Sequence, residues 1–362
     1  MNKIPFDEKE LKVVDEVPGF GGTTIPIFDF PITPREAAIR YYRDHDPVWM
    51  PLGVETTILV PPIIPDNIAR GAVREDIPWT TPFTKAKDMF GVEWVYVPSV
   101  GGAMENPDNP HLMDDVNDWE EKIHFPDIES WDWAGSAERN VKIRNTGRAN
   151  MLMFLNGMGF ERLISFMGFE DAAMALLDED QEDALHGLLH ALCDLHIAMV
   201  DKAIEYYHID GINLHDDWGS QQAPFFSEEA GRNFFLPEMK RLNDHIHERG
   251  LFCDLHSCGH IEDRCNLLVE AGFDAWTPMA MNNTAKLYDD WGDKMAIAVV
   301  TDTPFDPETA TEEEQREAAR HFVERFGGPG KQAFFSGYNK PGQLTRAFRE
   351  EMYKASREAY AR

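Results

Sequence analysis

Short apolar segments alternate with amphipathic segments of helical period along the chain from residue 151 onward. The apolar segments predict six strands, each followed by a helix, at 151–156, 210–215, 251–256, 273–278, 295–301 and 332–336. Strands that alternate regularly with helices are typical of a parallel sheet, because a return to a parallel neighbour needs a crossover connection. This part of the chain is therefore predicted to be α/β.

Residues at the expected helix ends support these repeats. Ser227 and Thr311 are each followed by acidic residues, and this combination is typical of the first turn of a helix. Pro237 is expected to kink or split the helix that begins after Ser227. Near the N-terminus, Thr33 precedes a proline and a glutamate, which predicts a helix that continues to about Arg43.

The first 150 residues are less regular, and two further strands are predicted there, at 46–52 and 92–98. Together with the six later strands they would give eight, the strand number of a TIM-type (β/α)8 barrel. A doubly wound open sheet is the alternative, but no glycine-rich nucleotide-binding fingerprint follows any predicted strand. We therefore expect one barrel domain over residues 1–362, with an irregular N-terminal region and an extension at 1–45.

Composition and charge narrow the classes of partner. The 362 residues are 43 % hydrophobic and 27 % charged, which is ordinary for a globular protein. With 34 basic and 64 acidic residues, the formal net charge is −30. Such a charge repels phosphate backbones and anionic lipid surfaces, so neither nucleic acid nor membrane is expected as a partner.

The N-terminal segment carries charges where a secretory signal would be apolar, and no apolar run approaches the ~18 residues of a membrane span. A cytoplasmic protein is therefore expected. The four cysteines do not resemble a disulfide framework in a chain of this length. Cys253, Cys258 and Cys265 lie close to His256 and His260, and such a cluster raises the case for metal or thiolate chemistry. For any single cysteine, the role of a small buried hydrophobic residue is the better interpretation.

Active sites of TIM barrels form at the carboxyl ends of the strands, and polar residues follow several of the predicted strands. Asn156, Asp302 and Tyr338 stand at or just after three such ends. We expect Asp302 to act in catalysis and Asn156 and Tyr338 to bind substrate. Loops are polar in any case, so each of these residues taken alone could equally be an ordinary polar residue of the loop that follows the strand.

The segment from Cys253 to His260 carries the sharpest local signal. Side chains two residues apart on a strand point to the same side, so His256 and Cys258 can approach one ion. Imidazole nitrogen and thiolate sulfur both bind zinc, and a catalytic zinc site needs only three protein ligands. Gly259 would allow a sharp turn after the second ligand. Chance and core packing are the alternative explanation for such a pair.

Two adjacent carboxylates, Asp216 and Asp217, end another predicted strand and are followed by Trp218. Such a pair can act as general acid and base, orient a zinc-bound histidine or bind a metal directly. Capping of the next turn and exposure to solvent are the alternative roles. By alternation along the strand, His215 is expected to face away from Asp216.

These motifs, taken in their order along the chain, resemble the uroporphyrinogen decarboxylase superfamily over about residues 150–340. The resemblance rests on five segments, namely 210–221, 234–237, 256–260, 272–275 and 289–293, and the stretch Pro47–Met50 extends it toward the N-terminus. It implies a TIM-type barrel with its cleft at the carboxyl ends of the strands.

The decarboxylases of this superfamily follow the stretch at 47–50 with an arginine pair that grips the substrate carboxylates. This chain has no arginine at 51–55, and no histidine at 336–338, where the decarboxylases carry a Gly-His-Gly segment. A substrate with many carboxylates would also lack a cationic clamp in a protein of net charge −30. Porphyrinogen decarboxylation is therefore disfavoured.

The zinc-dependent methyltransferase branch of the superfamily resembles the chain better. The resemblance implies that His256 and Cys258 bind zinc together with a later cysteine, but no cysteine follows Cys265. Either another residue completes the site, or the zinc is lost. The candidates are His215, Asp217, Glu229 and Tyr338.

The resemblance implies an enzyme that moves a methyl group between a small methyl ether or thiol and the corrinoid of a separate protein. Asp216, Asp217 and Asp302 are the expected catalytic residues. Trp49 and Trp218 are expected to line a pocket for a substrate that could be aromatic. A metal-independent carboxy-lyase and a non-catalytic small-molecule-binding barrel are the alternatives, and the pattern leaves a homodimer open.

Overall fold

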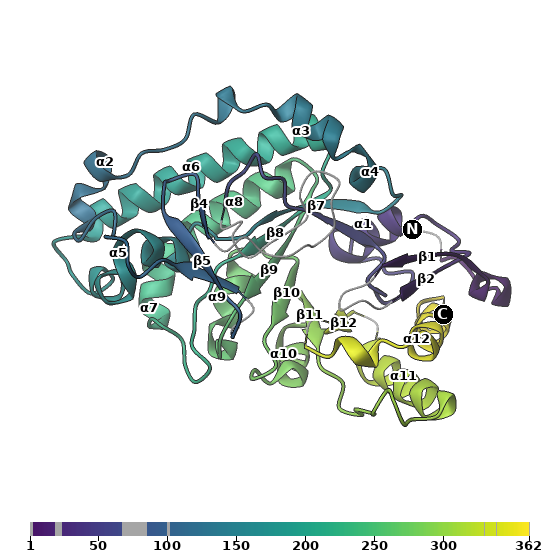
Figure 1. Cartoon of the computed structure of the whole chain (residues 1–362). Helices are drawn as coiled ribbons and strands as arrows, with labels where there is room; N and C mark the ends of the chain where they lie inside the picture. Colours follow the sequence, from purple (N-terminus) through teal and green to yellow (C-terminus); the bar gives the residue numbers. More distant parts are fainter. Residues whose placement is uncertain are drawn as a thin grey trace. The chain divides into compact units, whose positions relative to one another are not determined.

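The computed structural model describes residues 3–18, 24–66, 85–99, 102–328, 330–337 and 339–361 (Figure 1). The chain divides into two compact units. The first unit comprises Met1–Thr57, Gly147–Ala149 and Phe273–Arg362, and the second comprises Ile58–Thr146 and Asn150–Gly272.

Three parallel strands form the centre of the second unit, and they are β7 (Ala149–Phe154), β8 (Gly211–His215) and β9 (Phe252–Ser257). The register pairs Met151 with Gly211 and His215 with His256. All five residues of β8 are buried, as expected for a strand between two neighbours in a helix-covered parallel sheet. The register brings the carboxyl ends of β8 and β9 to the same level.

Helices connect these strands and follow them. They are α5 (Phe160–Ala175), α6 (Glu182–Tyr207), α7 (Glu228–Ala230), a π-helical turn (Gly231–Phe235), α8 (Leu236–Glu248) and α9 (Cys265–Glu270). Helix α6 packs against α8 (Figure 1). Ser227 caps α7 by accepting a hydrogen bond from Ala230 N, and the π-helical turn splits the segment just before Pro237, as the sequence predicts.

A separate antiparallel sheet also belongs to the second unit. Its strands are β4 (Lys85–Lys87), β5 (Glu93–Val97) and β6 (Gly102–Glu105). Short helical segments follow, namely η4 (Val116–Asp118), α2 (Trp119–Lys122), η5 (Ile128–Ser130), α3 (Trp133–Arg139) and α4 (Val141–Arg144).

The first unit contains three parallel strands of its own, β10 (Ala275–Pro278), β11 (Ala296–Val299) and β12 (Ala333–Phe335). Its helices are α1 (Pro34–Tyr42), α10 (Thr284–Trp291), α11 (Glu312–Phe326) and α12 (Arg346–Tyr360). It also contains the short turns η1 (Glu8–Leu11) and η8 (Pro341–Gln343), whereas the turn η7 (Glu262–Arg264) belongs to the second unit. An antiparallel hairpin of β1 (Val13–Pro18) and β2 (Thr24–Phe28) precedes α1. Thr33 and Thr311 cap α1 and α11 through their side chains, as predicted.

The six predicted strand–helix repeats correspond to β7–β12 and the helices after them, which confirms an α/β fold of TIM-barrel type. The first of the two earlier strand predictions is wrong. Residues 46–52 form no strand, and β3 (Thr56–Leu59) instead lies beside β7. The backbone N–H groups of Leu52 and Val54 donate to the buried Glu55 carboxylate. The hydrogen-bonding capacity of this apolar loop is therefore satisfied by a side chain, whereas in a strand the backbone of a neighbouring strand would satisfy it.

The second prediction, at residues 92–98, is confirmed as a strand, since most of these residues form β5. The strand pairs with β4 and β6 in the antiparallel sheet, and not with the parallel strands. Of its five residues only Trp94 is buried, whereas β8 of the parallel sheet is buried along its whole length. The sequence pattern therefore identified a strand correctly but not the sheet that contains it.

Candidate metal centre

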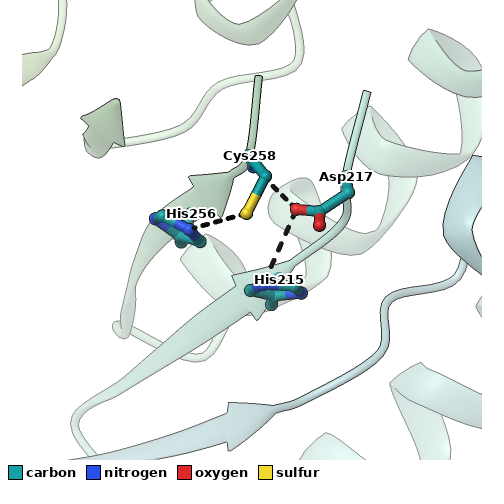
Figure 2. A group of neighbouring side chains, drawn as sticks. All are labelled: His215, Asp217, His256 and Cys258. Carbon is teal, nitrogen blue, oxygen red and sulfur yellow. Dashed lines mark hydrogen bonds and ion pairs between the residues drawn. The ribbon is translucent and has the colours of Figure 1, made fainter. Parts of the chain in front are cut away.

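Four side chains with metal-binding atoms meet at the carboxyl ends of β8 and β9 in the second unit (Figure 2). They are His215, Asp217, His256 and Cys258, and their ligand atoms all lie within 4.8 Å of one another. Figure 2 shows the four side chains turned toward a common space between the two strand ends. This places the pair predicted to bind metal beside two of the four candidates for a third ligand.

The strand register explains why these four meet. His215 lies opposite His256 in the parallel ladder, and their rings stack with centroids 5.1 Å apart and planes at 27°. Asp217 and Cys258 are each two residues further along, so both return to the side on which the histidines lie. Gly259 has φ +94°, and a Cβ there would overlap the backbone of Gly219, so the turn after Cys258 requires glycine.

Direct contacts already connect the group. Cys258 Sγ lies 3.6 Å from His256 Nε2, and His215 Nε2 lies 3.6 Å from Asp217 Oδ1. The Cys258 backbone N–H donates to Asp217 Oδ1 at 2.6 Å. The His215 side chain is 3 % exposed, whereas that of Asp217 is 26 % exposed, so the group is anchored on its buried side and open on the other.

The surroundings hold Asp217 in its ionised form. Burial opposes ionisation, but the positive charge that the His215 ring carries when it is protonated and the Cys258 N–H outweigh it and lower the pKa of Asp217 below its ordinary value. Two imidazole nitrogens, one sulfur and one ionised carboxylate form a donor set that zinc accepts, since Zn²⁺ binds His, Cys and Asp in four-coordinate sites. The residues present therefore fit a zinc ion.

Asp216 faces the opposite side of the strand end, as alternation predicts. Its Oδ1 accepts a hydrogen bond from Glu161 N at 3.0 Å, and its Oδ2 accepts one from Trp218 Nε1 at 2.9 Å. The side chain is fully buried, and burial raises the pKa of Asp216 to about 7. Asp216 and Asp217 are neighbours in sequence but occupy different environments.

Two residues predicted to bind substrate are buried in the second unit and are not part of the group of four. Trp218 is fully buried, and its indole donates to Asp216. Asn156 is also fully buried. In the orientation that pairs donors with acceptors, its amide nitrogen donates to Glu161 and its oxygen accepts from Arg162. In these positions both side chains contact other protein groups.

The other predicted site residues lie elsewhere. Trp49, in the first unit, is buried, stacks on Phe30 at 4.7 Å and donates to Glu55. Asp302, also in the first unit, has a half-exposed side chain 3.3 Å from His321 Nδ1. Glu229 is exposed on α7 and is not part of the group of four, and Tyr338 lies outside the described residues.

Sequence reasoning missed Glu161, whose carboxylate lies 3.0 Å from His215 Nδ1. It also missed Arg162, a fully buried residue that forms ion pairs with Asp66 at 2.6 Å and Asp88 at 2.7 Å. The available signal was the first turn of the helix after β7, where a glutamate and an arginine directly follow a glycine-containing loop.

A second group of potential ligands, His111, Asp114 and Asp171, lies on the surface of the same unit, and all three residues are exposed. Within the described part of the chain, no helix is both long enough and apolar enough to cross a membrane.

No family model and no curated protein sequence matches this chain. Among solved structures, the chain is similar to a methyltransferase from Methanosarcina mazei, at 15 % sequence identity and a TM-score of 0.49. The match covers 71 % of this chain and 72 % of that one.

Proposed function

We propose that this chain is a zinc-dependent methyltransferase or demethylase that moves a methyl group between a small methyl ether or thiol and a corrinoid carried by a separate protein. One observation carries the proposal: His215 and Asp217 lie with His256 and Cys258 at the carboxyl ends of β8 and β9. This is the edge at which TIM-type folds place their chemistry. The sequence resemblance to corrinoid-dependent methyltransferases supplies the reaction class.

The four side chains have distinct tasks in this proposal. His256 and Cys258 hold the ion, and His215 or Asp217 replaces the missing third cysteine. When bound, zinc supplies Lewis-acid stabilisation of the charge that develops on the oxygen or sulfur of the methyl donor or acceptor. That small molecule would approach from the exposed side of the group, where Asp217, His256 and Cys258 are only partly buried.

The first test is the zinc content of protein purified without added metal or chelator. We expect stoichiometric zinc in the wild type and its loss in the His256→Ala, Cys258→Ala double variant. The matched control is a His190→Ala, Cys193→Ala double variant on α6, which removes the same two residue types away from the site. Single His215→Ala and Asp217→Asn variants identify the third ligand by which of them weakens zinc binding.

Failure of the wild type to retain zinc, even after incubation with the ion at neutral pH, would overturn the proposal. The second test uses zinc-loaded protein with free cob(I)alamin and a panel of methyl ethers and methylated thiols. We expect methylcobalamin to form, as followed by its absorption spectrum, and the zinc-free double variant to form none. Release of CO2 from a carboxylic acid without a corrinoid would instead support a carboxy-lyase.

A further inference from the structure

Glu161 lies in the first turn of α5 and connects the metal-binding group to the buried interior of the second unit. One carboxylate oxygen, Oε2, lies 3.0 Å from His215 Nδ1. The other, Oε1, accepts a hydrogen bond from the Asn156 amide nitrogen at 3.0 Å. The Glu161 side chain is largely buried, so these contacts are shielded from competing water.

Asp216 fixes the position of the Glu161 backbone. Its Oδ1 accepts the Glu161 backbone N–H, and its Oδ2 is held by the Trp218 indole. This approach depends on the loop between β7 and α5, because a Cβ at Gly159 would overlap Asp216 Oδ2 and one at Gly157 would crowd the Asp216 Cβ. Two glycines thus let the carboxylate of Asp216 reach the start of α5.

The orientation of Asn156 is fixed by a neighbouring cation. Both amine nitrogens of the Arg162 guanidinium lie 3.1 Å from the Asn156 amide oxygen, and Arg162 is itself held by Asp66 and Asp88. An amide whose oxygen faces a guanidinium must point its NH₂ group the other way, which is toward Glu161. One oxygen of Glu161 is therefore committed to Asn156, and the other is aimed at His215.

A carboxylate only accepts hydrogen bonds, so the His215 nitrogen that faces Glu161 carries the hydrogen. When the ring is neutral, Nε2 then carries no hydrogen and can bind a metal, and it is Nε2 that faces Asp217 within the group of four. We propose that Glu161 and Asp216 are positioning residues: Asp216 orients Glu161, and Glu161 holds His215 with Nδ1 protonated and Nε2 directed at the metal. This inference rests on the proposed zinc site.

The test compares the zinc affinity of chelator-stripped wild type with that of Glu161→Gln and Glu161→Ala, measured by competition with a chromogenic chelator. The substitution Glu170→Gln is the matched control, since Glu170 is exposed on the same helix. Loss of such an outer partner of a ligating histidine weakens metal binding by about 10–100-fold, and we expect this range for both Glu161 variants. If Glu161→Ala does not fold, the near-isosteric Glu161→Gln carries the comparison.

Asp216→Asn extends the test by one step. An amide places an NH₂ group against one of two donors, so it can accept from Glu161 N or Trp218 Nε1 but not from both. We expect weaker zinc binding although Asp216 faces away from the metal-binding group. Zinc affinities of Glu161→Gln and Asp216→Asn equal to that of the wild type would overturn the inference.

Two further readouts separate positioning from a merely structural role. The ¹⁵N spectrum of zinc-free protein, with His215 assigned by a His215→Gln variant, should show hydrogen on Nδ1 in the wild type and redistribution to Nε2 in Glu161→Gln. The visible spectrum of the cobalt(II)-substituted protein should shift in Glu161→Gln but not in Glu170→Gln. A wild type that binds no zinc refutes the proposed function, whereas a zinc-binding wild type with unchanged Glu161 variants refutes this inference alone.

Discussion

A buried histidine on α6 should make the second unit sensitive to mild acid. His196 is fully buried, its ring meets the edge of Phe154 at 4.8 Å, and its Nδ1 donates to Leu192 O at 2.8 Å. Among the described residues, no partner is within hydrogen-bonding distance of its Nε2. A second proton would therefore enter an apolar environment without an acceptor, and burial lowers the pKa of His196 to about 4.

The sign and size of the effect follow from linkage between protonation and folding. The unfolded chain binds the proton with a pKa of about 6.5, whereas the native state excludes it until about pH 4, so stability falls as pH drops through this window. At pH 5 the difference lowers the free energy of unfolding by about 2 kcal/mol relative to neutral pH. Below about pH 4 the loss levels off, because both states are then protonated.

Urea unfolding at pH 7 and at pH 5 measures this loss in the free energy of unfolding. The variant His196→Gln removes the titrating ring, and we expect it to lose about 2 kcal/mol less than the wild type between these two pH values. His186→Gln, on the exposed face of the same helix, is the control and should keep the wild-type pH dependence. An equal loss of stability in His196→Gln and wild type would refute the reasoning, since His196 would then titrate alike in both states.

Three further outcomes are expected. Arg162→Met leaves Asp66 and Asp88 buried without their cation and should lower the free energy of unfolding by about 3–5 kcal/mol in urea; an effect near zero would contradict it. Gly259→Ala forces a left-handed φ on a side chain that overlaps Gly219, so about 1–3 kcal/mol of strain should weaken zinc binding as measured by chelator competition. Removal of bound zinc by a chelator should lower the thermal midpoint, since free zinc at about 100 times its Kd stabilises by about 2.7 kcal/mol; an unchanged midpoint would contradict a native zinc site.

The repeats after residue 150 could be predicted because each strand is short, apolar and followed by a helix. β8 is buried along its whole length, and Ser227 and Thr311 cap helices where the pattern places them. Local pattern failed at residues 46–52, where apolar side chains are buried in a loop whose N–H groups bind Glu55. A buried segment is apolar whether its backbone N–H groups donate to a neighbouring strand or to a carboxylate, so its sequence alone does not distinguish a strand from such a loop.

The group of four potential metal ligands was predictable to the extent that it depends on alternation. His256 and Cys258 lie on the same side because they are two residues apart, and His215 joins them because β8 and β9 pair in register. The register itself is a tertiary property, so His215 and Asp217 could be named only as two candidates among four. The structure reduces the described candidates to these two, since Glu229 lies outside the group.

The adjacent carboxylates show most clearly what a local motif leaves undetermined. Alternation assigns Asp217 to the side of the metal-binding group and Asp216 to the opposite side, but it does not say what lies there. That partner is Glu161, which is separated from Asp216 by 55 positions and approaches only because Gly157 and Gly159 leave room. Because Glu161 also contacts His215, the residue that faces away from the proposed metal still acts on it, through one carboxylate and one imidazole.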